Sequence, residues 1–484
     1  MTQPELLQVD DSASTTTDRG ATPVNDRREI FGWMMYDWAN SAFYTTVVGA
    51  LLGPYLTVLA QRAVGENGTL LNLGPLGEVT AKSFFPFCVS VAVFSQVFLL
   101  PMLGAIADYS VLKKKLMAVF CYTAVVATCL LFFVKGERYL FGGLLFIVAN
   151  LCYGAAMVFY NSYLPEITTE DQRDKVSSRG FALGYLGGGL LLALNLALVL
   201  GAEETFGITQ EFAVRVSLLS AGVWWGGFAL ITFAMLRTRE AARTLPANKS
   251  YFAIGIAELR STVGELRRLS HTLRYLIGYL FYNDGIQTVI GSASVFLAQE
   301  LFVARGLEAP QSFLLGIFLM AQFVAFGGAL VFERIAAVVG TKRAILLSLL
   351  IWAGIVIYAY GFFRTETQAW VMTAAIAFVL GGSQALSRSL FSRMIPKGRE
   401  ASFFGIYEIS ERGTSWLGPL IFSIVVASTG SYRQAILSLI FFFVIGIIIL
   451  LLTDTDRAVH EAGNALPEEI AHRADISSKA KVKR

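Results

Sequence analysis

The sequence predicts an all-α membrane protein with twelve transmembrane helices in two six-helix halves. The 484-residue chain is 55% hydrophobic and only 15% charged, which is far from the composition of a soluble protein. Residues 116–134, 216–236 and 435–452 contain no charged side chain. Each of these segments has about 20 residues, the length at which an α-helix crosses a hydrocarbon core of roughly 30 Å. A soluble domain would have to bury all these apolar faces at once, whereas lipid solvates them.

Apolar segments of this kind follow one another along most of the chain, separated by short polar loops. Their expected ranges are 33–58, 84–106, 116–134, 139–164, 181–201, 216–236, 275–298, 313–332, 344–363, 369–387, 403–426 and 434–452. Loops on the side of the N-terminus hold most of the 39 Lys and Arg residues. The few basic residues in the opposite loops are Arg62, Lys82, Lys135, Arg138, Arg215, Arg305, Arg364 and Arg433. The positive-inside rule therefore predicts that both termini lie in the cytoplasm.

The chain divides into five expected parts. They are a disordered cytoplasmic N-terminus (1–30), an N-terminal six-helix bundle (31–236), a cytoplasmic linker with an amphipathic helix (237–272), a C-terminal six-helix bundle (273–453) and a cytoplasmic tail (454–484). No apolar stretch precedes Ile30, so the sequence predicts no cleaved signal peptide. Apolar residues recur every three or four positions from Phe252 to Leu269, which indicates a helix on the membrane surface or an ordinary linker. The basic end of the tail fits a solvated segment near anionic lipid or a partner site.

The two halves repeat short motifs. Tyr-Asp-Trp at residues 36–38 lies in the first span, and Tyr-Asn-Asp at residues 282–284 lies in the seventh. Tyr-Leu-Pro at residues 163–165 closes the fourth span, and Met-Ile-Pro at residues 394–396 follows the tenth. Internal repeats of this kind are typical of transporters that alternate access by rocking one half against the other.

Two six-helix halves joined by a loop helix resemble the major facilitator superfamily. Gly104 and Asp108, followed by Lys113, resemble the superfamily's loop signature after the second span, which acts as a conformational latch. In this chain Tyr109 stands where the signature has a basic residue, and the second glycine is missing. The corresponding loop of the second half, residues 328–333, departs further from the signature.

Four longer segments carry a more specific resemblance. They are YDWANSAF (36–43), SSRGFALGY (177–185), YNDG (282–285) and GSQALSRS (382–389). Together they resemble the vacuole-effluxer-like family, which is grouped with the fungal autophagy-related vacuolar amino-acid effluxer. The resemblance covers residues 30–453, and kinship implies an amino acid as the transported solute.

Polar side chains inside the spans are the candidates for a functional site. A charged or amide group is costly against lipid, so such residues face the bundle interior and mark a pathway. The candidates for solute binding or ion coupling are Asp37, Asn40, Tyr44, Asn150, Tyr153, Asn161, Asn283, Asp284, Gln287 and Gln384. The candidates for gating are Gly104, Asp108, Lys113, Arg388, Glu408 and Arg412. The first set lies in spans one, four, seven and ten, which line the central cavity in the superfamily.

Several candidates also have a purely structural interpretation. Asn150 and Gln384 can simply join helices by hydrogen bonds. Asp37 can cap or anchor the first span near its cytoplasmic end. Glu408 and Arg412 are four residues apart, so they can neutralise each other on one helix face or act in gating. Near the second span, a carboxylate at the helix end beside the cationic loop predicts an ion pair.

We expect a secondary active transporter that moves a small solute outward by alternating access. Burial makes a carboxylic acid harder to ionise, so Asp284, deep in an apolar run, is the first candidate for proton coupling and Asp37 is the second. Asp37 near Asn40 also resembles the sodium-linked sugar symporters of the superfamily, so a cation-coupled sugar carrier is the alternative. A receptor or scaffold that uses the same fold without transport is another.

The candidate residues suit a small solute that bears opposite charges. A carboxylate binds an ammonium group, and a guanidinium from Arg388 or Arg412 binds a carboxylate. This chemistry fits a free neutral amino acid. Amides and tyrosines also bind sugar hydroxyls, so the sugar alternative stays open.

Other classes of function lack their residues in this sequence. The chain has no Gly-x-x-x-x-Gly-Lys-Ser/Thr sequence, and its three histidines lie outside the spans, so neither ATP-driven transport nor an intramembrane enzyme is expected. Its four cysteines form no CxxC pair, and we expect no cofactor, metal or disulfide. A net charge of +4 is too small to indicate nucleic acid. The expected partners are the solute, protons or sodium, and membrane lipid, and we expect a monomer in the plasma (inner) membrane.

Overall fold

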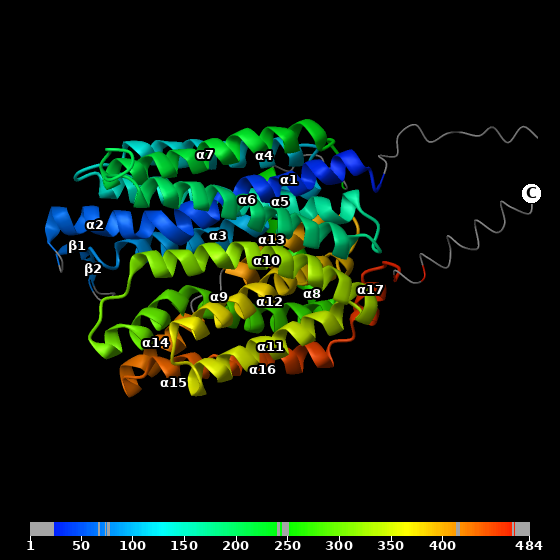
Figure 1. Ribbon diagram of the computed structural model, residues 1–484. Coiled ribbons are helices and arrows are strands. Elements are labelled where there is room, and N and C mark those ends of the chain that lie inside the picture. The colour runs from blue at the N-terminus through cyan, green and yellow to red at the C-terminus, as the bar shows by residue number, and fades with distance from the viewer. Residues whose placement is uncertain are drawn as a thin grey trace, which may run out of the picture.

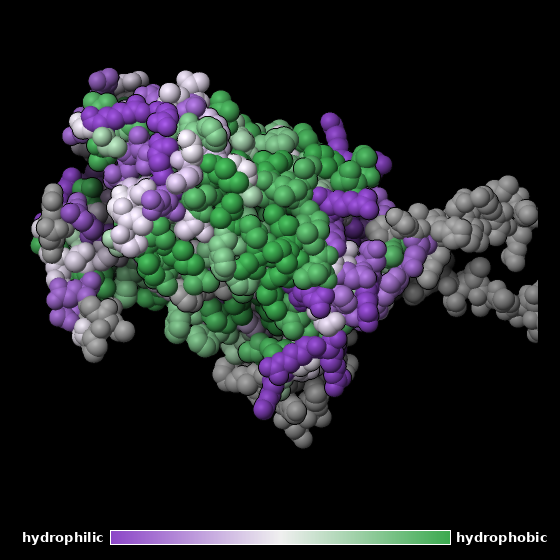
Figure 2. Space-filling view, turned by 90° about the horizontal axis from the view of Figure 1, so that it is seen from below, coloured by the Kyte–Doolittle hydropathy of each residue, from purple (hydrophilic) through white to green (hydrophobic). Residues whose placement is uncertain are grey.

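The structure is a computed structural model that describes residues 24–65, 68–72, 74, 78–239, 243, 251–412, 417–466 and 469, without the side chains of residues 251–256 and 412. Helices dominate the fold and run roughly along one common axis (Figure 1). Apolar side chains form a broad band across the middle of the face seen in Figure 2, and hydrophilic residues gather at both ends. This is the surface expected of a membrane-spanning bundle, because only its ends meet water.

The first half contains six membrane-length helical segments in its described residues. Its elements are α1 (Arg27–Ala42), the π-helix η1 (Phe43–Leu51), α2 (Leu52–Val64), β1 (Thr69–Asn72), β2 (Glu78–Thr80), α3 (Phe84–Asp108), α4 (Lys113–Leu130), the 3₁₀ helix η3 (Leu131–Phe133), α5 (Tyr139–Ile167), α6 (Arg173–Leu200) and α7 (Gln210–Met235). The elements from α1 to α2 form one continuous helical segment. β1 and β2 pair as an antiparallel hairpin that was not predicted.

The second half follows the linker helix. Its elements are α8 (Tyr251–Arg268), α9 (Ser270–Leu301), the 3₁₀ helix η4 (Val303–Arg305), α10 (Gln311–Val339), α11 (Thr341–Gly361), α12 (Glu366–Arg393), α13 (Glu400–Arg412), α14 (Leu417–Thr429), α15 (Tyr432–Ser438), α16 (Ile440–Leu452) and α17 (Thr455–Glu461). Eleven of the described helical segments are long and apolar enough to cross a membrane, and α14 is a shorter apolar helix. The predicted span 403–426 is described as two helices, α13 and α14, so the described helices account for the twelve predicted spans.

Many helices extend beyond their expected spans because polar residues continue them past the apolar segment. The first begins at Arg27 rather than at residue 33, and Asp26 caps it by accepting a hydrogen bond from the backbone N–H of Arg28. The prediction of disorder up to residue 30 is therefore wrong for its last residues. The tail also starts in an ordered form, since Asn464, beyond α17, donates to the backbone carbonyl of Arg393.

Two hydrophobic cores lie one in each half. The first includes Trp33 and Trp225, and the second includes Trp352, all three fully buried. Across the boundary between the halves, α6 packs against α10 and α3 packs against α13. In contrast, α14 packs chiefly against α9 and α15 of its own half. Contact between α3 and the eleventh span is therefore concentrated on α13.

Both described ends of the chain lie at one end of the bundle, which we call the terminal face (Figure 1). α1 begins there and α17 follows α16 there, whereas the β1–β2 hairpin lies at the opposite end. Small residues on α6 let it approach α1 closely. A Cβ atom on Gly180 would lie 2.7 Å from Oδ2 of Asp37, and one on Gly184 would lie 2.7 Å from Oγ of Ser41. The two glycines therefore bring the Asp37 carboxylate against α6.

Candidate functional site

The centre of the interface between the halves is an ion pair between Asp37 on α1 and Arg388 on α12. Nη2 of Arg388 lies 3.3 Å from Oδ2 of Asp37, and the two residues are 1% and 5% exposed. The hydroxyl of Tyr160 on α5 donates to the same carboxylate oxygen at 2.7 Å. Asp37 was predicted to bind solute or a coupling ion, or to cap its helix, and Arg388 was predicted to act in gating. The structure brings these two candidates together.

The guanidinium of Arg388 has further partners that hold it in place. Nη1 donates to Oδ1 of Asn161 at 3.2 Å, and Nε donates to Oγ of Ser177 at 3.0 Å. Aromatic rings of Trp33 and Phe181 lie 4.8 and 4.2 Å from its Cζ atom. A buried charge is tolerated only where such partners compensate for its lost hydration. In this arrangement Arg388 is fully engaged by protein groups.

Asn161 extends this network to α13. Its Nδ2 donates to Oε1 of Glu408 at 2.6 Å, and Glu408 is 0% exposed. Glu408 was predicted to pair with Arg412, whose side chain lies outside the described residues. That pair, or the alternative role in gating, therefore stays a prediction, and the hydrogen bond to Asn161 connects Glu408 to a residue 247 positions away in the other half. The candidates Asp37, Asn161, Arg388 and Glu408 therefore form one connected polar network.

Asp284 on α9 lies apart from that network and contacts the N-terminal end of α14. It is 0% exposed, and its Oδ2 accepts a hydrogen bond from the backbone N–H of Gly418 at 3.0 Å. Oδ1 is buried and has no hydrogen-bond partner among the described residues. A Cβ atom on Gly418 would lie 2.0 Å from Oγ1 of Thr288, so only glycine allows this close approach.

In this arrangement Asn283 and Gln287, the polar neighbours of Asp284 on α9, share no hydrogen-bond partner with it among the described residues. Nδ2 of Asn283 donates to the backbone carbonyl of Glu411 at 2.9 Å. Gln287 is half-buried, and it makes no hydrogen bond within the described part of the chain. The predicted polar stripe on the seventh span is therefore divided between different contacts.

The remaining candidates on the first and fourth spans lie mainly in aromatic and apolar surroundings. The ring of Tyr153 lies 5.5 Å from that of Phe43 and 6.5 Å from that of Tyr44, measured between centroids. Tyr44 is 46% exposed although it lies at the middle of its helical segment. Nδ2 of Asn40 lies 3.6 Å from the sulfur of Met157, which is a weak hydrogen bond.

Two amide candidates were also given a role in joining helices. Oε1 of Gln384 accepts a hydrogen bond from the hydroxyl of Tyr185 at 2.7 Å, which connects α12 to α6 across the halves. For Asn150 it is the backbone carbonyl that accepts, from Nε2 of Gln96 at 2.7 Å. Gln96 and Tyr185 were not among the predicted site residues.

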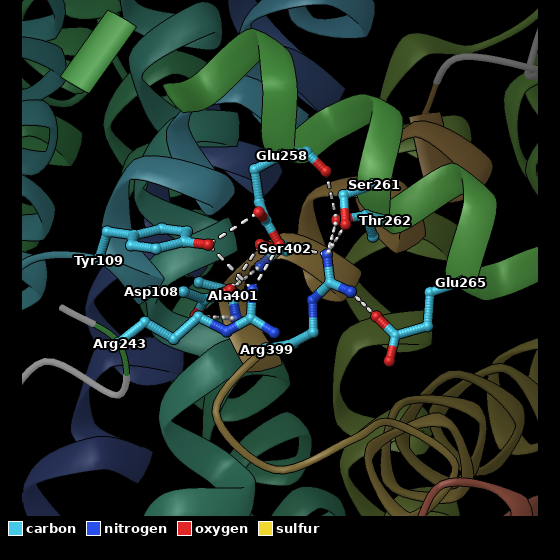
Figure 3. Close-up of polar contacts among 10 residues, drawn as sticks. All are labelled: Asp108, Tyr109, Arg243, Glu258, Ser261, Thr262, Glu265, Arg399, Ala401 and Ser402. Carbon is cyan, nitrogen blue, oxygen red and sulfur yellow. Dashed lines mark hydrogen bonds and ion pairs between the residues drawn. The ribbon is translucent and has the colours of Figure 1, made fainter. Parts of the chain in front are cut away.

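At the terminal face, Asp108 joins α3 to the start of α13, in what we call the first latch (Gly104, Asp108, Ala401 and Ser402). Figure 3 shows Asp108, Ala401 and Ser402 of this latch. Oδ1 of Asp108 accepts from the backbone N–H of Ala401 at 3.0 Å. Oδ2 accepts from the N–H and the hydroxyl of Ser402 at 2.9 and 2.5 Å. A Cβ atom on Gly104 would lie 2.1 Å from the carbonyl oxygen of Ala401. Both candidates therefore sit at the contact between the halves.

The expected ion pair between Asp108 and the cationic loop is not what forms. Lys113 pairs with Glu166 on α5, and its Nζ lies 5.6 Å from the ring centroid of Tyr163. The buried carboxylate of Asp108 is stabilised by the charge of Lys113 without direct contact and by hydrogen bonds from the N–H groups at the start of α13. These donors come from the other half, about 290 residues away, so sequence proximity to Lys113 is misleading.

The linker helix α8 contacts this latch through Glu258 (Figure 3). Glu258 accepts from the hydroxyl of Tyr109 at 2.9 Å and pairs with Arg243 at 2.8 Å and with Arg399. Arg399 also pairs with Glu265. Burial lowers the pKa of Arg399, although Glu258 opposes this effect. Glu258, which was expected on the polar face of this helix, faces the polar cluster between α3 and α13, and the placement of the helix on the membrane surface or as an ordinary linker stays a prediction.

A second set of contacts connects α6 with the second half, and its exposed part is the second latch (Arg179 and Glu333). Nε of Arg179 lies 3.4 Å from Oε2 of Glu333 on α10, and the Arg179 side chain is 50% exposed. Nearby, Asp174 in the first turn of α6 pairs with Arg393 at 2.7 Å and accepts from Oγ1 of Thr341 at 2.6 Å. This is the region where the second half's loop departs from the superfamily signature.

The candidate list drawn from the sequence left out several contributors to the network. Tyr160, Ser177 and Arg399 all contact a candidate or its latch, as described above. Tyr160 directly precedes Asn161, and Ser177 opens one of the quoted motifs, so both had a signal in the sequence. Arg399 had only its position before the eleventh span. All four cysteines are free, and the described residues contain no cluster of three metal ligands.

Comparisons with known proteins match nearly the whole chain. The family model described as vacuole effluxer Atg22 like matches residues 25–463. YxiO of Bacillus subtilis (strain 168), an uncharacterized MFS-type transporter, is 30% identical over 438 residues, which cover 90% of this chain and 97% of that protein. Autophagy-related protein 22-1 of Penicillium rubens is 24% identical over 563 residues, which cover 91% of this chain and 92% of that protein.

Solved structures of transporters share the fold. The human organic anion transporter MFSD10 superposes with a TM-score of 0.65 at 14% sequence identity, over 89% of this chain and 100% of that chain. The fucose:proton symporter FucP of E. coli superposes with a TM-score of 0.64 at 9% identity, over 88% of this chain and 98% of that chain. At these identities the likeness concerns the fold alone, which is that of the major facilitator superfamily.

Proposed function

The chain belongs to the Atg22-like vacuole effluxer family and is a transporter of the major facilitator type, and on this premise we propose that it exports a neutral amino acid by alternating access. Family and fold are those of transporters, which are not enzymes. The observation that carries the proposal is the buried ion pair between Asp37 and Arg388, which joins the two halves.

The moving units under this proposal are residues 31–236 and residues 273–453. Charged connections that hold them together in the present arrangement include the Asp37–Arg388 pair and the two latches at the terminal face. On the opposite side α14 keeps to its own half. These contacts support an arrangement that is closed toward the terminal face. Rocking toward the other state must separate the connected charges.

The separated charges supply the solute site. An open terminal face exposes one carboxylate, on Asp37, and one guanidinium, on Arg388. An amino acid carries an ammonium group for the first and a carboxylate for the second, so it replaces the ion pair with two of its own. A neutral sugar offers neither charge, and binding it would leave both buried groups without a counter-ion.

Competition between the solute and the ion pair favours release of the solute on the opposite side. When the terminal face closes again, Asp37 and Arg388 recombine with each other, with Tyr160 and Ser177 as additional partners. The recombined pair lowers the affinity of the site for the solute in this state. The gradients of the solute and of the coupling ion then set the direction of net flux, which under this proposal is outward.

The coupling ion under this proposal is a proton carried by Asp284. Its carboxylate is fully buried and forms no ion pair with any described residue. One of its oxygens has no hydrogen-bond partner among the described residues. An ionised carboxylate with so few partners is costly in an apolar interior, so uptake of a proton is favourable. Asp37 does not share this property, because Arg388 neutralises it.

We place the terminal face in the cytoplasm and the protein in the plasma (inner) membrane. The support is the concentration of Lys and Arg in the loops of that side. Engineered cysteines at residues 70 and 306 should react with an impermeant reagent added outside sealed cells, and a cysteine at residue 255 should not. Labelling at residue 255 would reverse the assigned orientation.

Thermal unfolding of the purified protein tests the solute class, because a ligand that binds the native state raises the apparent Tm. Neutral amino acids should raise the Tm of the wild type, and Asp37→Asn and Arg388→Lys should lose this response. Tyr185→Phe is the matched control, since it removes another polar contact between the halves without changing a charge. It should keep the response.

Flux into proteoliposomes separates the proposal from its alternatives. Labelled amino acids should cross the membrane of proteoliposomes that hold the wild type. A sugar that shifts the Tm and crosses, with no amino acid doing either, would identify the chain as a sugar carrier. Binding of a solute without any flux would identify it as a receptor or scaffold on the transporter fold.

Proton coupling is tested at Asp284. The substitution Asp284→Asn keeps the shape and keeps an acceptor for the Gly418 N–H, but it removes the titrating group. Accumulation driven by a pH gradient should be abolished, while solute exchange at equal pH continues. Ser292→Ala removes a hydroxyl on the same helix that donates to the backbone carbonyl of Thr288, and it should leave both activities intact. Unchanged gradient-driven accumulation in Asp284→Asn would remove this residue from the mechanism.

A further inference from the structure

A cavity of about 610 Å³ lies between α1 and α6 at the terminal face, outside the network described above. The lining residues used below are Arg27, Ile30, Phe31, Met34, Lys175 and Arg179. The four on α1 follow the spacing i, i+3, i+4 and i+7, which places them on one face of the helix. The two on α6 are four residues apart and also share one face. One face of α1 and one face of α6 therefore line the same cavity.

The cavity is cationic. Its described lining contains three basic residues and no acidic one. Arg27 and Lys175 are exposed, and neither forms an ion pair within the described residues. Arg179 is partly neutralised by Glu333, at 3.4 Å. The excess positive charge therefore belongs to Arg27 and Lys175, and an anion placed between them would relieve their mutual repulsion.

The wall of the cavity on α1 becomes apolar away from the terminal face. Ile30 and Met34 are half-buried, and Phe31 is 43% exposed. From Arg27 to Met34 the helix rises about 10 Å, at roughly 1.5 Å per residue. The cavity therefore offers cationic groups near the membrane surface and apolar groups deeper along a membrane-spanning helix. This order matches the order of phosphate and acyl chain in a phospholipid.

We propose that this cavity binds one anionic phospholipid of the leaflet at the terminal face. Its phosphate lies between Arg27 and Lys175, and its acyl chain lies along Phe31 and Met34. A cavity of this volume is in the range of ligand pockets and accommodates a headgroup with the first part of a chain. The site adjoins the closed interface, because Arg179 on its wall directly precedes Gly180, which contacts the carboxylate of Asp37.

Native mass spectrometry of the detergent-purified, full-length protein tests this site without any transport measurement. The probes are phosphatidylglycerol and phosphatidylcholine, each titrated into the protein. We expect one phosphatidylglycerol to bind in preference to phosphatidylcholine. The double variant Arg27→Gln/Lys175→Gln should weaken phosphatidylglycerol binding by about thirtyfold, because each basic residue near an anionic lipid contributes about fivefold.

A matched control removes two cations that do not line the cavity. Arg28 and Lys115 are exposed near the terminal face, and the variant Arg28→Gln/Lys115→Gln should bind phosphatidylglycerol as the wild type does. Equal loss in both double variants would overturn the proposal, since it would show attraction to the surface charge as a whole. Equal binding of phosphatidylcholine would overturn it as well.

Two further measurements distinguish a lipid from a free phosphate. Inorganic phosphate and glycerol 3-phosphate at millimolar concentration should leave the Tm unchanged, whereas phosphatidylglycerol should raise it. The substitution Met34→Trp fills the apolar part and leaves all three cations, and it should also weaken lipid binding. A Tm shift with inorganic phosphate equal to that with lipid, or full lipid binding by Met34→Trp, would contradict an acyl chain in the cavity.

Discussion

The two latches occupy corresponding places in the two halves, yet they differ in burial and in the groups that they use. In the first, Asp108 is 2% exposed and accepts three hydrogen bonds at the start of α13. In the second, the half-exposed Arg179 pairs with Glu333 at 3.4 Å. Both connect the halves at the terminal face. In the first latch the buried carboxylate of Asp108 would lose its hydrogen-bond donors if the halves separated. In the second latch water can hydrate the charges of Arg179 and Glu333 when the pair separates.

This difference teaches that topology alone does not set the strength of a latch. A buried acceptor that loses its donors costs about 1–3 kcal/mol for each unsatisfied group. An exposed ion pair contributes about 0–1 kcal/mol, because water and salt screen it. The loop that keeps part of the superfamily signature therefore holds the halves together more strongly than the loop that departs from it. Four substitutions test this ranking, with spin labels at the exposed residues Lys115 and Arg343 reporting the distance between the halves.

The largest effect is expected for Asp108→Ala. It removes all three acceptor contacts and leaves the N–H groups of Ala401 and Ser402 buried without partners. We expect a shift of about 3 kcal/mol toward the state that is open at the terminal face, or roughly 150-fold in the ratio of states. Double electron–electron resonance measures the populations of the long and short distances. Unchanged populations would mean that the first latch does not hold the halves.

A somewhat smaller effect is expected for Gly104→Ala. The added Cβ would lie 2.1 Å from the carbonyl oxygen of Ala401, so α3 and α13 must separate, at a cost of about 1–3 kcal/mol. Gly328→Ala is the matched control, because its Cβ would lie 2.1 Å from the carbonyl oxygen of Phe378 in the same half. The control should lower the Tm without lengthening the distance between the labels. Opening by both variants would show that any helix distortion suffices.

Glu258→Gln tests the contribution of the linker helix. The substitution removes the charge that Arg243 and Arg399 share, while Arg399 keeps its second partner, Glu265. We expect an opening shift of about 1–2 kcal/mol, between those of the two latches. Hydrogen exchange of the α8 backbone should also accelerate. Faster exchange with no change in the label distance would limit α8 to a linker role.

The smallest effect is expected for Glu333→Gln in the second latch. Because the pair is exposed, its loss should change the distribution by about 0.5 kcal/mol or less. Raising the salt concentration from 0.1 M to 1 M should abolish even this difference, since the Debye length falls from about 10 Å to about 3 Å. The Asp108→Ala shift should persist in high salt. A Glu333→Gln effect as large as that of Asp108→Ala would reverse the ranking of the latches.

Much of the fold follows from the sequence because lipid constrains each helix separately. A span must be long and apolar whatever its neighbours are, so the helices could be located without knowing their contacts. The π-helix η1 was not predicted, because it falls inside a segment with the apolar content of an ordinary span. The approach of Gly418 to Asp284 and Thr288 of another helix was not predicted either, because it is a tertiary contact.

The site was predicted in part. The sequence pointed to Asp37, Asn161, Arg388 and Glu408, because a polar group inside a span is costly against lipid and therefore faces the bundle interior. Their connections were not predictable, since Asp37 and Arg388 are 351 residues apart. Lys113 shows the opposite error, because it lies close to Asp108 in sequence but pairs with Glu166. The sequence shows which spans contain polar residues, but only the tertiary packing determines which of these residues contact one another.

The separation of Asp37 and Arg388 along the chain has a consequence for biosynthesis. A ribosome adds about 5–20 residues per second, so about 20–70 s pass between the synthesis of Asp37 and that of Arg388, 351 residues later. During this interval the first helix is already available for membrane insertion, where an aspartate costs about 2.5–3.5 kcal/mol at the bilayer centre and less at the position of Asp37 nearer the membrane surface. Tyr160, which is made 123 residues after Asp37, provides the earlier partner. The nascent first half therefore carries the negative charge of Asp37 without its counter-ion until Arg388, in the last third of the chain, has been synthesised.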